Sequence, residues 1–246
     1  SILKIFLENF YFLIVLILYP TGLLNLGEAL VPALFVIALS YYFLARRSFK
    51  LVENIFIKAQ THLQQAKPKF DIAVKEMEEA YKLTRWQFGL KSQIDGQIGV
   101  VLFIQREFSK AEPYLERSLG FGHWLGGAML GVIQYKKKKH DKMRETFDIV
   151  VKKAKKQGLP WNLYAYLLNQ VGARDEAIKI LSEAVKKTKN DPKVAESLLA
   201  LQNNKKIKMK TYKEQWYQFH LEKPPVQYQQ HQMGGKISKS MRRGRW

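Results

Sequence analysis

The chain has 246 residues, with 41 Lys and Arg against 21 Asp and Glu, which gives a formal net charge of +20. It contains no cysteine, which excludes a disulfide-bonded secreted domain, a cysteine-ligated zinc site and a cysteine nucleophile. Hydrophobic residues make up 47% of the chain, so disorder over its whole length is also excluded. The charge is uneven, because residues 1–45 carry a net charge of −1 and residues 205–246 a net charge of +9. The sequence therefore predicts three regions, 1–47, 48–204 and 205–246.

Residues 1–47 are predicted to form a transmembrane helical hairpin. The apolar stretches 2–19 and 29–45 are each long enough, as helices, to reach the lower limit for crossing a bilayer core. A short segment with Gly and Pro separates them, so the two helices should be antiparallel. A signal peptide fits less well because a second apolar stretch follows the first. A buried hairpin of a soluble protein fits less well because charged residues are almost absent.

Basic residues predict the orientation of this hairpin. Lys4 precedes it, Arg46 and Arg47 follow it, and the intervening loop has no Lys or Arg. By the positive-inside rule both ends face the cytoplasm. We therefore expect a two-pass protein of the bacterial inner membrane with both termini in the cytoplasm. Glu8 is unusual in such a segment, and it either lies near the headgroups or pairs with a partner subunit.

Residues 48–204 are predicted to form a helical repeat domain. The periodicity is helical with short breaks, and no alternating run of β-branched residues predicts a strand. One unit is clear at 158–191, where large and small residues recur at steps of three and four on two helices separated by Gly172. Its pattern residues are Trp161, Ala165, Leu168, Ala177, Leu181 and Ala184.

The same layout recurs upstream in the chain. One copy lies a full repeat before the clear unit, at Gly131, Met143, Phe147 and Val150. Another copy lies about one repeat before that, at Gly99, Ala111, Leu115 and Ser118. At these residues the chain resembles the tetratricopeptide repeat family. The resemblance implies an all-α fold, with an α-solenoid of about three to four helix-turn-helix repeats. The unit around Gly131 departs from the family, which usually has an aromatic residue in place of Gly127 and a glycine turn in place of Lys138. A generic helical bundle is the alternative.

The resemblance also implies a concave groove lined by the first helix of each repeat. Such a groove suits an extended or helical peptide, here a protein subunit of an envelope-associated assembly. In the alternative, a register shifted by one residue would place Val100, Phe103 and Val132 in the core. The expected groove residues are Gln93, Gly96, Val100, Phe103, Ala128, Val132, Tyr135, Lys136, Asn162, Tyr166, Asn169 and Gln170.

No pattern in the sequence predicts catalysis, a cofactor or a metal site, and we expect a protein that is not an enzyme. The histidines have no metal-ligand spacing, and nucleophile-elbow, phosphate-loop and dinucleotide motifs are absent. The glycines between 120 and 131 are better explained by helix packing than by phosphate binding.

Residues 205–246 are predicted to be a disordered basic tail that contains aromatic residues. This composition suits nucleic acid, an anionic membrane surface or an acidic protein. The expected function is a membrane-anchored adaptor or scaffold. The alternative is a membrane-tethered binder of nucleic acid or anionic lipid that acts through this tail. The residues expected at an anionic surface are Arg46, Arg47, Lys136, Lys137, Arg242 and Arg243.

Overall fold

The computed structural model describes residues 26–65, 68–86 and 89–225. Within these ranges all regular secondary structure is helical, which confirms the predicted all-α class. In the same part of the chain no helix combines the length and the apolar character needed to cross a bilayer. The first stretch expected in the membrane, 2–19, and the end of the tail, 226–246, lie outside the described residues.

The chain divides into two compact units, 1–53 and 54–246. In the first unit, the second stretch expected in the membrane belongs to helix α2 (Leu26–Leu63). Arg46 and Arg47 are exposed on this helix. Large apolar side chains on it are exposed as well, among them Leu34, Phe35, Leu39, Tyr42 and Phe43.

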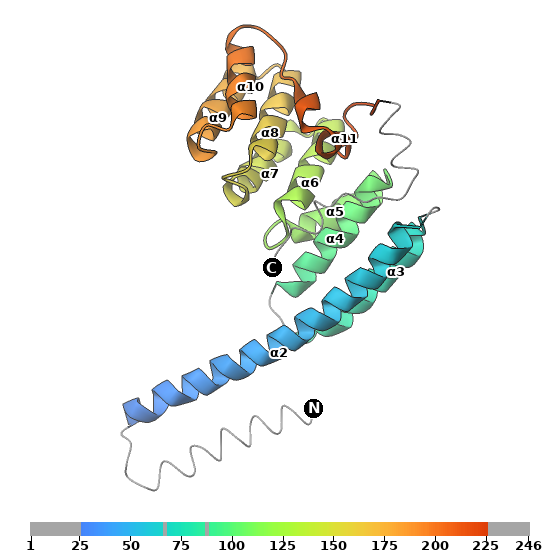
Figure 1. The fold of residues 1–246 in the computed structure, drawn as a ribbon, viewed down its shortest axis with the longest axis vertical. Coiled ribbons are helices and arrows are strands. Elements are labelled where there is room, and N and C mark those ends of the chain that lie inside the picture. The colour runs from blue at the N-terminus through green and yellow to red at the C-terminus, as the bar shows by residue number, and fades with distance from the viewer. Residues whose placement is uncertain (1–25, 66–67, 87–88, 226–246) are drawn as a thin grey trace. The chain divides into compact units, whose positions relative to one another are not determined.

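The second unit is built mainly from antiparallel helix pairs (Figure 1). It begins with the end of α2, α3 (Phe70–Glu79) and a short 3₁₀ helix, η1 (Ala80–Trp86). Three hairpins follow, and α10 (Pro192–Gln202) packs against the last of them. The first helices of the hairpins and α10 begin at a constant interval along the chain, at Leu90, Trp124, Gly158 and Pro192. The hairpins are α4 (Leu90–Ile104) with α5 (Phe108–Ser118), α6 (Trp124–Lys136) with α7 (His140–Lys153), and α8 (Gly158–Gln170) with α9 (Arg174–Lys187).

One turn geometry ends α4, α6, α8 and α10. The second residue after each helix end has a positive φ: 67° at Arg106, 58° at Lys138, 84° at Gly172 and 57° at Asn204. The next backbone N–H then donates to the carbonyl five residues earlier, at distances of 2.7–3.0 Å. This is the Schellman arrangement that satisfies the last carbonyls of a helix. Lys138 therefore adopts the turn for which the family usually has glycine.

Small residues on the first helices let the second helices approach closely. A Cβ atom at Gly99 would lie 2.6 Å from Cδ2 of Leu115, and one at Gly131 would collide with the ring of Phe147. Ala165, at the equivalent position of α8, is fully buried. Each hairpin thus buries its apolar face against its own partner helix and against its neighbours.

The expectation of disorder from residue 205 is wrong for residues 205–225. This segment forms η2 (Met209–Tyr212) and α11 (Glu214–Tyr217), and it packs against α8. Trp216 and Phe219 have no exposed surface, and Tyr217 is 4% exposed. Burial of these rings offsets the entropy lost on ordering the chain, while the lysines between 205 and 213 stay in solvent.

Candidate functional site

The predicted groove residues lie on α4, α6 and α8, as expected for first helices. Their exposure differs along the face. Phe103 and Val132 are fully buried, and Val100 and Asn162 are nearly so. Those that keep some exposure are Gln93, Tyr135, Lys136, Tyr166, Asn169 and Gln170.

The chain's own C-terminal segment covers part of this face. We call residues 207–222 the strap, and Figure 1 shows it following α10 and passing beside α8. The amide nitrogen of Asn162 donates to the hydroxyl of Tyr212 at 2.8 Å. The ring of Trp216 meets that of Tyr166 edge-on, with centroids 5.0 Å apart. Two of the predicted groove residues on α8 therefore hold two aromatic residues of the strap.

Glycine at the start of α8 makes room for this contact. A Cβ atom at Gly158 would lie 3.0 Å from the hydroxyl of Tyr212 and 2.8 Å from Oδ2 of Asp191. The ammonium group of Lys193 lies 4.7 Å from the centre of the Tyr212 ring. Burial, and to a smaller extent Asp191, raises the pKa of Tyr212, so its hydroxyl stays protonated.

The far end of the strap reaches α4 and α6 through His220. Its ring lies 5.6 Å from that of Phe103 and 6.1 Å from that of Phe108. Its Nε2 lies 3.2 Å from the carbonyl oxygen of Ile104 and therefore acts as the donor. Its own carbonyl oxygen accepts a hydrogen bond of 3.0 Å from Nζ of Lys136.

Burial and, to a smaller extent, nearby positive charge favour the neutral form of the His220 ring. Burial, with a further contribution from Arg106, lowers the pKa of His220. Burial and Arg106 also lower the pKa of Lys136. On α8, burial and the carboxylate of Glu222, the last residue of the strap, raise the pKa of the Tyr166 hydroxyl. This face therefore presents aromatic rings, a lysine ammonium group and an amide to the strap.

Some buried polar atoms of α6, α8 and the strap have no hydrogen-bonding partner within the described protein. They are Oε1 of Gln134, Oδ1 of Asn162 and Nε1 of Trp216. Gln134 and Asn162 are 4% and 1% exposed. Unpaired buried polar atoms are uncommon, and these can accept hydrogen bonds from, or donate one to, another segment.

No local motif of the sequence identifies the strap as a segment that covers the predicted groove residues. Tyr212, Trp216 and His220 are spaced by four residues, a helical periodicity that could have indicated a packed segment. Two lysines expected at an anionic surface are engaged within the protein, since Lys136 binds the strap and Lys137 pairs with Glu112. Arg242 and Arg243 lie outside the described residues.

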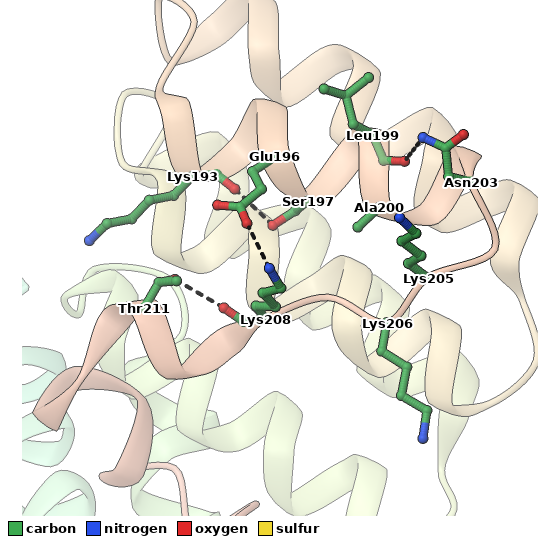
Figure 2. Close-up of a pocket in the computed structure, with 10 residues that line it drawn as sticks. All are labelled: Lys193, Glu196, Ser197, Leu199, Ala200, Asn203, Lys205, Lys206, Lys208 and Thr211. Carbon is green, nitrogen blue, oxygen red and sulfur yellow. Dashed lines mark hydrogen bonds and ion pairs between the residues drawn. The ribbon is translucent and has the colours of Figure 1, made fainter.

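A pocket of about 230 Å³ lies between α10 and residues 203–211. Four lysines and one glutamate contribute charge to its lining, and Figure 2 shows them around the hollow. Glu196 accepts from Lys208 at 3.4 Å, which leaves the other three, Lys193, Lys205 and Lys206, without a carboxylate partner among the described residues. The pocket can therefore attract anions. Across the described residues no group of His, Asp and Glu side chains could hold a metal ion.

Comparison with known proteins found no family model that matches this chain, and no curated protein or solved structure that matches it. The resemblance to tetratricopeptide repeats therefore rests on the spacing of the residues given above.

Proposed function

We propose that the protein is a membrane-attached scaffold whose helical repeats bind a segment of a partner protein in the concave face. The observation that supports this is the contact between that face and an aromatic segment, the strap. Three predicted groove residues, Phe103, Asn162 and Tyr166, each contact a different aromatic or histidine residue of the strap. A face that holds one such segment has the chemistry to hold another.

The strap is then a competitor of the partner. While the strap occupies the face, a partner can bind only those molecules from which the strap has been released. The apparent affinity for the partner is therefore the intrinsic affinity multiplied by the released fraction. The unpaired oxygen atoms of Gln134 and Asn162 stay on the helices when the strap is released, so a partner can make hydrogen bonds with them that the strap does not make.

Attachment to the membrane is part of the same proposal. It is supported by the two apolar stretches of residues 1–47 and by the exposed apolar side chains of α2, including Phe35 at 68% and Phe43 at 59% exposure. The expected location is the bacterial inner membrane with the repeats in the cytoplasm. The partner is then a subunit of an assembly at that membrane.

The test is site-specific photo-crosslinking in native membranes. A photoreactive residue replaces Asn169, which is partly exposed on α8, and a matched control replaces Ile149 on the outer helix α7. We expect an adduct with one partner from position 169 and none from position 149. Trp216→Ala should raise the adduct yield because it weakens the strap, and Tyr166→Ala should lower it.

A competition experiment tests whether the partner binds the face that the strap covers. A synthetic peptide with the sequence of residues 207–222 should suppress the adduct. Equal adducts from positions 169 and 149, or an adduct that the peptide leaves unchanged, would overturn the proposed groove function. Phe103→Ala is not a suitable variant, because this ring is fully buried and its loss would destabilise the fold.

A second candidate function is binding of nucleic acid or anionic lipid through residues 205–246. The lysine-lined pocket next to α10 favours it, because Lys205 and Lys206 are exposed at the start of this region. Such binding should weaken steeply with salt and survive Tyr166→Ala. Lys205→Gln with Lys206→Gln should weaken it, whereas binding that is insensitive to salt would reject it.

A further inference from the structure

Exposed lysines gather at one end of the α6/α7 and α8/α9 hairpins. They occupy the last turns of α7 and α9 and the connections that follow these helices. All six are exposed, and they are Lys152, Lys155, Lys156, Lys186, Lys187 and Lys189. We call this set the lysine edge.

The repeat architecture brings the two groups of lysines to the same end of the hairpins. Helices α7 and α9 have 14 residues each and hold equivalent places in successive hairpins. They run in the same direction, because each is antiparallel to the helix α8 that lies between them in the chain. Arg144 and Glu176 form an ion pair of 3.0 Å near the start of the two helices. The last turns of α7 and α9 therefore lie at the same end of the two hairpins.

An exposed aromatic ring adjoins this edge. Nζ of Lys153 donates to the carbonyl oxygens of Leu119 and Gly122, at 2.5 and 3.0 Å, and so holds the α5–α6 connection against the end of α7. That connection carries Phe121, whose surface is 58% exposed. The interval between the starts of successive first helices also separates Phe121 from Lys155, and Lys155 from Lys189. These three residues therefore hold equivalent positions in three successive repeats.

Charge at the two ends of the hairpins is unequal. At the opposite end, Lys137 and Lys139 pair with Glu112, and Arg144 pairs with Asp141 and Glu176. Among the described residues, none of the six lysines of the edge has an ion-pair partner. The nearest carboxylates along the chain are Asp148, Glu183 and Asp191. Asp148 accepts from the hydroxyl of Tyr164 at 3.3 Å, and Asp191 accepts the backbone N–H of Lys193 at 2.9 Å. The edge therefore keeps most of its positive charge.

We propose that the lysine edge docks on the anionic lipid headgroups of the membrane to which the chain is attached, with Phe121 entering the interfacial layer. The inference rests on the membrane attachment in the proposed function and not on the groove. Charge complementarity and the adjoining exposed ring identify the occupant, since lysines attracted to anionic headgroups and an apolar side chain at the interface act together at membrane surfaces. A soluble polyanion such as RNA would need only the charge.

The test uses the full chain reconstituted in lipid nanodiscs. Because the chain has no cysteine, Gly120→Cys provides a single labelling site next to Phe121, where an added side chain meets no other atom within 4 Å. An environment-sensitive fluorophore on this cysteine reports burial in lipid. We expect its emission to rise in nanodiscs of phosphatidylcholine with phosphatidylglycerol, relative to phosphatidylcholine alone, and to return to the neutral-lipid value at high salt. A label at Asp175→Cys, at the opposite end of the hairpins, should not respond.

Two double variants distinguish docking by the lysine edge from an effect of the overall positive charge of the protein. Titration of the emission against the phosphatidylglycerol fraction gives a docking constant. Lys155→Gln with Lys189→Gln should lower it by about thirtyfold, from two lysines at ~1 kcal/mol each. The matched control, Lys142→Gln with Lys179→Gln, removes two exposed lysines elsewhere and should change it little.

The outcomes distinguish the two proposals. If the protein fails to incorporate into nanodiscs, the proposed membrane attachment is overturned. If it incorporates but responds equally to neutral and anionic lipid, or loses the response equally in both double variants, docking by the lysine edge is overturned. A response to a soluble RNA oligomer but not to anionic lipid would overturn it in favour of nucleic acid.

Discussion

The α6/α7 and α8/α9 hairpins have the same dimensions but different residues at their key contacts. In each, a first helix of 13 residues is followed by a second of 14. At the close approach, α6 has Gly131 facing the ring of Phe147, whereas the buried pattern residues of α8 and α9 are Ala165 and Leu181. At the turn, Lys138 stands where the other hairpin has Gly172.

Between these two hairpins, combined volume and backbone geometry are preserved and residue type is not, whereas α4 and α5 pair Gly99 with Leu115. A smaller residue on the first helix accompanies a larger one on the second, so the interhelical distance is maintained. A left-handed turn is formed by lysine at one site and by glycine at the other, at different intrinsic cost. Exchanging these features between the hairpins tests each part of the comparison.

The largest effect on the free energy of unfolding is expected where α6 approaches α7 closely, at Gly131. Gly131→Ala should lower the free energy of unfolding by about 1–3 kcal/mol, because its Cβ collides with the Phe147 ring. Combining it with Phe147→Leu, as in the other hairpin, should recover part of this loss. The recovery is partial because Phe147 also stacks on Tyr164, with centroids 5.0 Å apart. Urea unfolding of the two single variants and the double variant gives the coupling free energy. Strict additivity would contradict the volume argument.

A smaller effect is expected at the turns. Lys138→Gly should raise the free energy of unfolding by about 1 kcal/mol, since glycine adopts a positive φ without steric cost. Gly172→Lys should lower it by a similar amount. Urea midpoints measure both changes. A destabilising Lys138→Gly would mean that the lysine side chain contributes more than its backbone conformation costs.

The smallest effect is expected at the beginning of the first helices and depends on pH. Nδ1 of His123 accepts the backbone N–H of Leu125 at 3.3 Å, whereas Gln157 makes no such bond before α8. Burial, and the charge of Lys153, lower the pKa of His123 below its unfolded value. The unfolded chain therefore takes up the proton first, and stability should fall as the pH drops below about 6.5. Thermal unfolding of the wild type and of His123→Asn across this range should show a weaker pH dependence in the variant. An equal dependence would assign the effect to other groups.

The sequence predicted the helical class and the hairpins because these depend on local patterns. Ala177, Leu181 and Ala184 recur at helical spacing and are fully buried, as expected. The turn at Lys138 was harder to predict, since a lysine gives no signal for a left-handed conformation. Its geometry follows from the two helices that it connects, which determine the backbone between them.

The predicted groove residues lie on the first helices of the hairpins, as expected, but the strap that covers part of this face was not predicted. Contacts such as that between Ile104 and His220 join residues 116 positions apart, and no local pattern encodes them. The lysines of residues 205–213 dominate the composition of that segment, although the aromatic rings beyond them determine its packing. Average composition therefore predicted a tail where side-chain spacing would have predicted a packed segment.

The strap also changes how the repeats should unfold. A stack in which each hairpin contacts only its neighbours can fray from either end, because its stability is a sum of local terms. By joining α8 to α4 across α6, the strap links non-adjacent hairpins through contacts of high sequence separation. Such contacts make the loss of one hairpin weaken the others, and they slow folding because a long loop must close before they form. Releasing the strap would therefore convert a cooperative unit into an array whose ends open independently.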